Sequence, residues 1–368
     1  MTPVRGRRSW AALLLVGAGL TIGMLLVETI LRARYTEDEF RARFGGAGEA
    51  SPSHLIAHPF LPFAGRPGAE YRRYMGETGE FINVTQNTYG FRAREFPQTK
   101  GANDYVVVCL GESTTWGYVD ESNATTWPAL LEQRLAVKYP EKNVKVFNLG
   151  MEGGSSAYSV VVLGLIGVHL QPDLVIAYHG FNDYGPATAQ SFRTDYAHHY
   201  VDVDPDAAWR GFRRNLPGWM LSSYAVTLAA SQADRLVRVN SLPAAGQREL
   251  GDQAETPAKA ARRFLPNLQT IDSLARGSGA QTLFSTFQFY DADNDQARFV
   301  NGGLRDYFAE QGLPFVDQDA LLPDGDRTIN IDQCHLTRKG RELLAGNFFD
   351  YIIAHGLVDK ANAVQHDE

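Results

Sequence analysis

Cysteine and concentrated positive charge are what this sequence has least of. It contains 2 cysteines, Cys109 and Cys334, too few for the disulfide framework of a small secreted domain. We expect both to be small buried apolar residues, with a single bridge in an oxidising compartment as the alternative. The net charge is -7 and the sequence pI is about 5.8. Because nucleic-acid binding needs clustered Lys and Arg, we expect no nucleic-acid partner.

Motifs for phosphate and metal binding are also missing. The glycine-rich segment 148–155 lacks the spacing of a dinucleotide-binding G-x-G-x-x-G, and no Walker-type lysine follows it. The Asp-rich segment 291–295 resembles the start of a calcium loop, but Gln296 stands where that loop needs glycine. We expect a solvated loop and a helix N-cap there. Since adjacent histidines rarely point at one site, His198 and His199 do not predict a metal site either.

An uncharged apolar run does occur near the N-terminus. Residues 9–27 read SWAALLLVGAGLTIGMLLV, about the length that spans a bilayer as a helix. Arg5, Arg7 and Arg8 precede this run, and positive residues tend to stay on the cytoplasmic side. A cleaved signal peptide begins in the same way, but its apolar core is shorter and an A-x-A-like site follows it. We therefore expect an uncleaved single-pass anchor, with the rest of the chain outside the cytoplasmic membrane.

The rest of the chain has the pattern of an α/β protein. The whole sequence has a hydrophobic content of 44% and an aromatic content of 11%, which indicates a folded chain. Repeated strand and helix units predict a three-layer α/β/α fold with a mostly parallel central sheet. The predicted strands are 105–110, 144–148, 174–178, 282–286 and 314–316, and the predicted helices are 126–139, 156–170, 264–276, 296–311 and 337–355.

These elements divide the chain into five predicted parts. One long segment, about 190–261, interrupts the alternation of strands and helices inside the α/β domain. A lid over the site and a mobile surface excursion are two equally good interpretations of it. The parts are a cytoplasmic tail 1–8, a transmembrane anchor 9–31, a stalk and β-rich lead-in 32–100, the α/β domain 101–357 and a C-terminal tail 358–368.

One serine stands out by its surroundings. In VVVCLGESTTWG a β-branched run ends at a glycine and places Ser113 in a tight turn, where α/β proteins put a nucleophile or a phosphate. A catalytic serine needs a base, a group that orients the base, and donors for an oxyanion. Asp332 and His335, three residues apart just before the last predicted helix, can supply the first two. Gly153 and Asn182 follow two other predicted strands and can supply donors.

Taken together, these segments resemble the blocks of the SGNH (GDSL-like) hydrolase superfamily, in the same order and at comparable strand ends. The resemblance covers about residues 105–355. The family's first block often has Asp where this chain has Glu112, a change expected to alter the geometry of the turn more than the mechanism. The matching segments are Gly111 to Ser113, Asn148 to Gly153, Gly180 to Asp183 and Asp332 to His335, and Asn87 to Arg92 resembles an N-x-x-G-F-R element of membrane-attached members.

The resemblance implies a flavodoxin-like SGNH fold, no cofactor and a role for each site residue. Ser113 would be the nucleophile, His335 the base, and Asp332 the group that orients it. The backbone amides of Ser113 and Gly153 and the side chain of Asn182 would form the oxyanion hole.

The implied reaction is hydrolysis of an acyl ester, such as an O-acetyl ester, on a glycan, a lipid or a small molecule. Two alternatives stay open. The same chemistry could pass the acyl group to a cell-envelope glycan, as in an O-acyltransferase. A vestigial site in a membrane-anchored binding or assembly protein is the other alternative. Nothing in the sequence separates water from a sugar as the acceptor.

Overall fold

The computed structural model describes residues 5–37, 40, 44, 54–56, 58–75, 78–190, 192–200, 220, 222–241 and 256–359. The chain divides into two compact units: Met1–Ser53 with Asp206–Ala245, and His54–Pro205 with Gly246–Glu368. Parts of four predicted segments lie outside the described residues. The longest stretches are 1–4 of the cytoplasmic tail, 45–53 of the stalk, 201–219 and 242–255 of the insertion, and 360–368 of the C-terminal tail.

The first unit contains the N-terminal helix α1 (Arg5–Arg34) and helix α9 (Tyr224–Ser241). The part of α1 from Leu15 onward is long and apolar enough to cross a membrane, although a signal sequence passes the same test. The Glu28 side chain accepts hydrogen bonds from the Ser223 hydroxyl at 2.8 Å and the Ala225 amide at 2.9 Å. One carboxylate of α1 therefore caps the start of α9.

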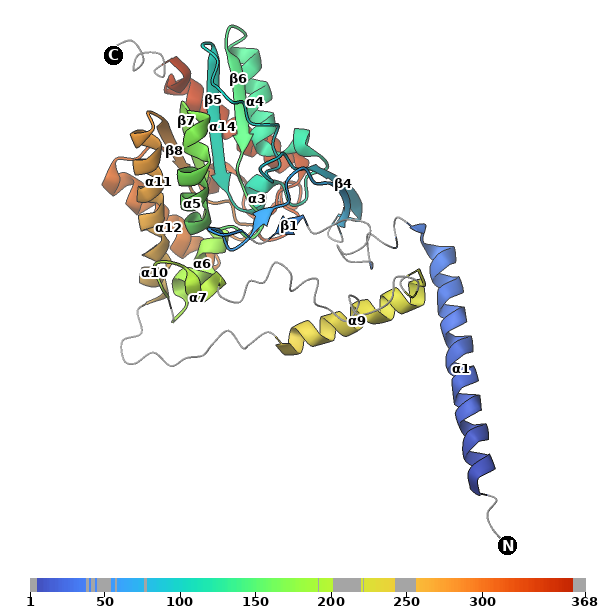
Figure 1. The fold of residues 1–368 in the computed structure, drawn as a ribbon. Coiled ribbons are helices and arrows are strands. Elements are labelled where there is room, and N and C mark those ends of the chain that lie inside the picture. Colours follow the sequence, from blue (N-terminus) through green and yellow to red (C-terminus); the bar gives the residue numbers. More distant parts are fainter. Residues whose placement is uncertain are drawn as a thin grey trace. The chain divides into compact units, whose positions relative to one another are not determined.

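A five-stranded parallel sheet forms the centre of the second unit (Figure 1). Strand β5 has seven buried residues in a row, the pattern of a strand covered on both faces. The strand order is β6-β5-β7-β8-β9, so the chain adds strands on one side of β5 and then on the other. The strands are β5 (Asp104–Gly111), β6 (Asn143–Asn148), β7 (Leu174–Tyr178), β8 (Gln281–Ser285) and β9 (Phe315–Val316).

Helices cover both faces of this sheet (Figure 1). One layer pairs α4 (Trp127–Lys138) with α14 (Arg338–Ala354), and the other pairs α5 (Ser156–Leu165) with α11 (Leu265–Gly277). Helix α12 (Asp295–Gln311) packs beside α6 (Phe181–Thr188), which follows β7. The predicted three-layer α/β/α fold is therefore confirmed.

Two local details refine the predicted helices. The helix expected over 156–170 ends at Leu165 and continues as a separate 3-10 turn, Gly167–Leu170. Gly167 lies against Leu163, where an added Cβ would come within 2.9 Å of the leucine side chain. At the Asp-rich segment, Asn294 caps α12 by accepting a hydrogen bond from the Ala297 amide, as the sequence predicts.

The lead-in before the sheet contains two small antiparallel pairs. Strand β1 (Leu55–Ile56) pairs with β2 (Ala64–Gly65), and β3 (Glu70–Met75) pairs with β4 (Glu80–Thr85). Gly90, from the N-x-x-G-F-R element, has a φ of 84° and lies against Gly65. A Cβ at Gly90 would stand 2.0 Å from the Gly65 carbonyl oxygen, so only glycine fits here.

The β3–β4 hairpin has a small hydrophobic cluster of its own. Met75, Ile82 and Val84 from the hairpin pack against Trp116 and Val119, which follow the Ser113 turn. Trp116 is fully buried. The lead-in thus packs directly beside the segment that carries Ser113.

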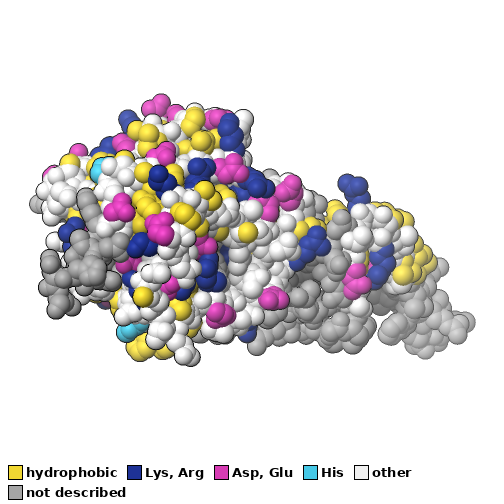
Figure 2. All heavy atoms as spheres, turned by 90° about the horizontal axis from the view of Figure 1, so that it is seen from above, with side chains coloured by type: hydrophobic (Ala, Val, Ile, Leu, Met, Phe, Trp, Pro, Cys, Tyr) yellow, Lys and Arg dark blue, Asp and Glu magenta, His cyan; other side chains and the backbone are white. Residues whose placement is uncertain are grey.

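Charged side chains of both signs are intermixed on the face drawn in Figure 2. Lys and Arg side chains lie among Asp and Glu side chains there, rather than gathered by sign. The described side chains of this face therefore form no extended field of one sign that would steer a polyanion.

Candidate active site

The predicted site residues meet at the carboxyl ends of the central strands. Ser113 follows β5 and Gly180 follows β7, and these two neighbouring strands pair in parallel. The strand order reverses between them, because β6 lies on the far side of β5. Open α/β sheets bind their ligands at such a reversal, outside the carboxyl ends of the strands.

A tight turn carries Ser113 out of the sheet. Ser113 begins the one-turn helix α3 (Ser113–Trp116) directly after β5. A Cβ at Gly111 would lie 2.1 Å from Thr115 Oγ1 and 2.8 Å from the Tyr178 carbonyl oxygen. The glycine before the serine is therefore required for the chain to turn this sharply.

Ser113, His335 and Asp332 form a continuous hydrogen-bonded line. Ser113 Oγ lies 2.9 Å from His335 Nε2, and His335 Nδ1 lies 2.7 Å from Asp332 Oδ2. The other carboxylate oxygen, Oδ1, accepts from the backbone amides of Cys334 at 2.9 Å and His335 at 2.8 Å. A proton on Nδ1, bonded to the carboxylate, leaves Nε2 free to accept from the serine.

These bonds also fix the charge of Asp332. Burial alone would raise the pKa of this carboxyl, but the hydrogen bonds from the His335 ring and from the two backbone amides bring it well below its usual value. Asp332 therefore stays ionised beside the imidazole. An ionised partner stabilises the positive charge that forms when the histidine accepts a proton.

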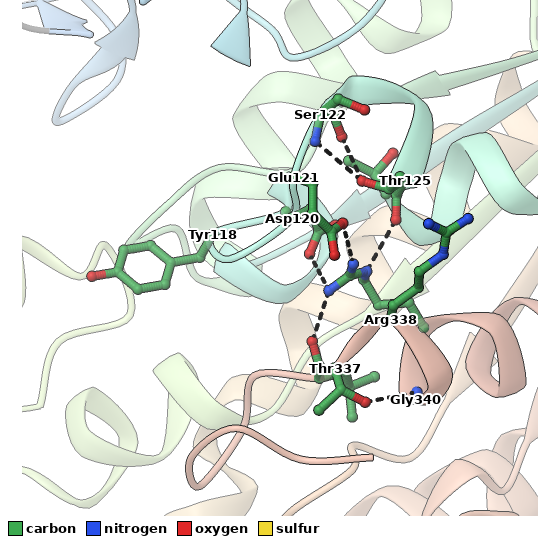
Figure 3. Close-up of polar contacts among 12 residues, drawn as sticks. Tyr118, Asp120, Glu121, Ser122, Thr125, Thr337, Arg338 and Gly340 are labelled. Atoms are coloured by element: carbon green, nitrogen blue, oxygen red, sulfur yellow. Dashed lines mark hydrogen bonds and ion pairs between the residues drawn. The ribbon is translucent and has the colours of Figure 1, made fainter. Parts of the chain in front are cut away.

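Arg341 on α14 holds the loop that carries His335. Its guanidinium donates to the Leu336 carbonyl oxygen at 2.9 Å and to the Thr125 carbonyl oxygen at 3.0 Å. It also pairs with Asp120 at 3.0 Å and with Glu121 at 2.6 Å, and these carboxylates lie side by side near the start of α14 (Figure 3). Burial raises the pKa of Asp120 to about 6 against the opposing effect of two arginines. One buried cation thus joins the segment after Ser113 to the residue after His335.

The three predicted oxyanion donors lie at the ends of three strands. In the described part of the chain, neither the Ser113 amide nor the Gly153 amide donates a hydrogen bond to another residue. Gly153 is exposed and has a φ of 73°, in the region that favours glycine. One hydrogen of the Asn182 side-chain amide goes to the Gly154 carbonyl oxygen at 2.9 Å, which orients the amide and leaves its second hydrogen available.

Glu112 ties the serine turn to the asparagine turn. Its carboxylate accepts from the Gly180 amide at 2.8 Å and from the Asn182 amide at 2.9 Å. Burial, followed by the charge of Asp183, raises its pKa well above the usual value. This agrees with the expected structural role of Glu112, and its extra methylene lets it reach both amides of the neighbouring loop.

A second group of titratable residues lies beneath the site and was not expected from the sequence. Asp183 accepts from the Ser156 amide at 3.0 Å, the Ser156 hydroxyl at 2.6 Å and the Tyr196 hydroxyl at 3.0 Å. His179 is fully buried, and neither of its ring nitrogens has a hydrogen-bond partner. Burial lowers the pKa of His179 to about 3. The only sequence signal for this group is Asp183, the last residue of the matching segment Gly180 to Asp183.

Two groups among the described residues have the proximity needed to share a metal ion. One is the site itself, at Asp332, Cys334 and His335, and the other is Glu112, His179 and Asp183. Carboxylate oxygens of both groups already accept hydrogen bonds from backbone or side-chain donors. His198 and His199 belong to neither group, and the acidic residues that follow them, at 202–206, lie outside the described residues.

Both cysteines are free and buried, as expected for small apolar residues. Burial raises the pKa of both thiols well above its usual value. Neither thiol is therefore suited to nucleophilic chemistry in this state.

The family is shown by comparison with known protein families. The sequence model of the GDSL-like lipase/acylhydrolase family matches residues 109–343. The chain belongs to this family. It is therefore a hydrolase that acts on ester bonds, and the matched range contains Ser113, Gly153, Asn182, Asp332 and His335. The lead-in lies before this range.

Solved structures of a lipase/acylhydrolase and of an acetylxylan esterase resemble the chain at low identity. A lipase/acylhydrolase from Enterococcus faecalis is 17% identical to this chain, with a TM-score of 0.41. The matched region spans 68% of this chain and 96% of the Enterococcus chain. An acetylxylan esterase from Geobacillus stearothermophilus is 12% identical, with a TM-score of 0.42. The matched region spans 70% of this chain and 96% of the esterase chain. No curated protein matches the chain.

Proposed function

We propose that this chain is a serine esterase that uses Ser113, His335 and Asp332. Ser113 Oγ attacks the acyl carbonyl carbon while His335 Nε2 takes the hydroxyl proton. The tetrahedral intermediate then expels the alcohol, which receives that proton from His335. Water, activated by the same histidine, releases the acid and restores the serine. Asp332 holds the imidazole in the tautomer that both steps need.

The observation that carries this proposal is the line of contacts from Ser113 Oγ to His335 Nε2, and from His335 Nδ1 to Asp332 Oδ2, at 2.9 and 2.7 Å. A nucleophile, a base and an orienting group within hydrogen-bond reach are the signature of an activated serine. The available amides of Ser113 and Gly153 and the Asn182 side chain supply donors for the oxyanion. This complete set also argues against a vestigial site.

We further propose that the reaction takes place outside the cytoplasmic membrane, on an ester of a glycan, a lipid or a small molecule. The support is the apolar part of α1 from Leu15 onward, with Arg5, Arg7 and Arg8 before it. Positive residues at the N-terminal end favour an N-in orientation of such a helix. The second unit would then lie on the outer side.

The test is an assay of the full-length protein in detergent with p-nitrophenyl acetate and with longer p-nitrophenyl esters. The wild type should release p-nitrophenol, whereas Ser113→Ala should release none above background while keeping its circular dichroism spectrum. Including sugar oligomers and measuring products by mass spectrometry separates the acceptors. Free acid as the main product supports the esterase, and acylated sugar as the main product would replace it with a transferase. A folded wild type without turnover on any ester contradicts both.

A further inference from the structure

The lead-in contributes a charged residue to the surroundings of the proposed base. We propose that Arg73, which lies before the residues matched by the family, is a positioning residue for His335 and acts on it through Tyr118. This inference rests on the proposed function, because it assigns Arg73 a role only if His335 is the base. Arg73 itself touches neither Ser113 nor His335 in any described contact.

Arg73 is fixed in the β3–β4 hairpin. It pairs with Ile82 across the hairpin, and Ile82 belongs to the small hydrophobic cluster beside Trp116. Its guanidinium lies 5.3 Å from the Trp116 ring centroid, and its side chain is only 22% exposed. The guanidinium therefore points into the protein and not into solvent. Its role follows from the residues that it contacts there.

The carboxylate of Glu152, from the glycine-rich segment 148–155, holds this guanidinium in place. Arg73 Nη1 donates to Glu152 Oε2 at 3.0 Å and to Oε1 at 3.2 Å, and His54 Nε2 lies 2.9 Å from Oε2. Burial alone would raise the pKa of Glu152, but Arg73 and His54 lower it to about 2. Glu152 thus stays ionised, and the pair it forms with Arg73 is partly buried on both sides.

Arg73 then holds Tyr118 in two ways. Its Nη2 donates to the Tyr118 carbonyl oxygen at 3.2 Å, and its guanidinium carbon lies 4.7 Å from the Tyr118 ring centroid. The Tyr118 ring in turn stacks on the His335 imidazole, with centroids 4.7 Å apart and planes 26° apart. The guanidinium and the imidazole thus both lie against the ring of Tyr118.

The next residues of this segment are anchored elsewhere. Figure 3 shows the Tyr118 ring turned away from Asp120 and Glu121, which pair with Arg341. The backbone after Tyr118 is therefore held by α14, while the ring and carbonyl of Tyr118 are held by Arg73. Without Arg73, Tyr118 would lose the hydrogen bond to its carbonyl oxygen and the guanidinium that lies over its ring.

The stacked ring matters most when His335 carries a proton. An aromatic face stabilises a cation that lies over it, so Tyr118 favours the imidazolium formed in each step. The stack also limits rotation of the imidazole, and small misplacements of a catalytic group are costly, about a hundredfold in rate for 1 Å. Arg73 therefore contributes through the placement of the base and not through its own charge.

The experiment compares Arg73→Lys with Tyr118→Leu and with the double variant. Lysine keeps the positive charge beside Glu152 but cannot make the same planar, multiple contacts. Arg72→Lys is the matched control, because Arg72 precedes Arg73 on the same strand, is exposed and lies over the Phe81 ring. The readouts are kcat, KM and the pH dependence of kcat/KM for p-nitrophenyl acetate, with thermal melting to check folding.

We expect Arg73→Lys to lower kcat by about tenfold or more with little change in KM. The acid limb of its kcat/KM profile should move to lower pH, because a displaced Tyr118 ring stabilises the imidazolium less. Tyr118→Leu should move it in the same direction, and the double variant should add little to either single change. Arg72→Lys should match the wild type.

Three results would overturn this role. They are an unchanged profile in folded Arg73→Lys, a shift to higher pH, and additive effects in the double variant. If the wild type itself shows no Ser113-dependent turnover, the proposed function fails first and the Arg73 role falls with it. If the wild type turns over and Arg73→Lys behaves like Arg72→Lys, only the Arg73 role is wrong.

Discussion

Two histidines lie next to carboxylates at the same edge of the sheet, and their surroundings differ. His335 is 13% exposed and contacts both Ser113 and Asp332 at hydrogen-bond distance. His179 is 1% exposed, lies 3.8 to 3.9 Å from the carboxylates of Asp183 and Glu112, and bonds to neither. Proximity of a histidine to a carboxylate is therefore not enough for proton transfer.

The two sites differ in which side chains are ionised and which are neutral. Asp332 is held ionised, so it can stabilise a protonated His335. Burial instead lowers the pKa of His179 to about 3 and raises the pKa of Asp183 to about 6. The buried group thus favours neutral side chains, while the partly exposed group is arranged to hold charge. The following substitutions test this difference between the two histidines.

His335→Ala should have the largest effect. Removing the base from a serine triad costs on the order of 10⁶ in kcat in other serine hydrolases, so we expect a loss of at least about 10⁴-fold. Folding should be retained, because the ring of His335 is partly exposed. Ester turnover and circular dichroism check this. Wild-type turnover in a folded variant would mean that another group is the base.

Asp332→Ala should have the next largest effect. Loss of a buried orienting aspartate costs about 10⁴-fold in other triads. Asp332 is 38% exposed, and the His335 carbonyl also accepts a hydrogen bond from the Ile331 amide at 2.8 Å, so the loop keeps part of its order. We therefore expect a smaller loss with measurable remaining turnover. A loss as complete as that of His335→Ala would show that the backbone contributes no orientation.

Asn182→Ala should lower kcat more than it raises KM. The loss of one oxyanion donor costs about 10² to 10³ in kcat. Steady-state kinetics on p-nitrophenyl acetate separate the two constants. An effect confined to KM would place Asn182 in substrate binding and remove it from the oxyanion hole.

His179→Leu should change activity least, by less than about tenfold, and should change acid stability instead. Because the folded pKa of His179, about 3, lies below its ordinary value of 6.5, the unfolded chain binds a proton that the folded chain does not. Wild-type stability from this residue is therefore lost as the pH falls from 6.5 toward 3. Between pH 7 and pH 4, the free energy of unfolding of the variant should therefore fall by about 3 kcal/mol less than that of the wild type.

Urea unfolding at both pH values measures this difference. Asp183, whose pKa is raised to about 6, contributes with the opposite sign in both proteins and so cancels in the comparison. Equal acid sensitivity of variant and wild type would show that His179 is not held neutral.

Much of the fold could be predicted from the sequence, and so could the residues proposed for the site, because their signals are local. The β-branched run before Gly111 and the short D-x-x-H spacing each act within a few residues. The 2.9 Å contact between Ser113 and His335 joins residues 222 positions apart, and it follows once both stand at carboxyl ends of one parallel sheet.

The contacts that support the site could not be predicted in this way. Glu112 reaches two amides across the sheet edge, and its partners depend on the backbone of the next loop. Arg73 meets Glu152 and Tyr118 because the register of a hairpin aims one of two adjacent arginines inward. Such pairings depend on tertiary packing, for which a single sequence carries no local pattern.

The most direct test of the proposed mechanism is covalent labelling with a fluorophosphonate probe. The full-length protein, His335→Ala and His179→Leu would be labelled in detergent and read by intact mass and peptide mapping. We expect one adduct at Ser113 in the wild type and in His179→Leu, and almost none in His335→Ala. An adduct at another residue, equal labelling of His335→Ala, or no labelling of the folded wild type would contradict an activated Ser113.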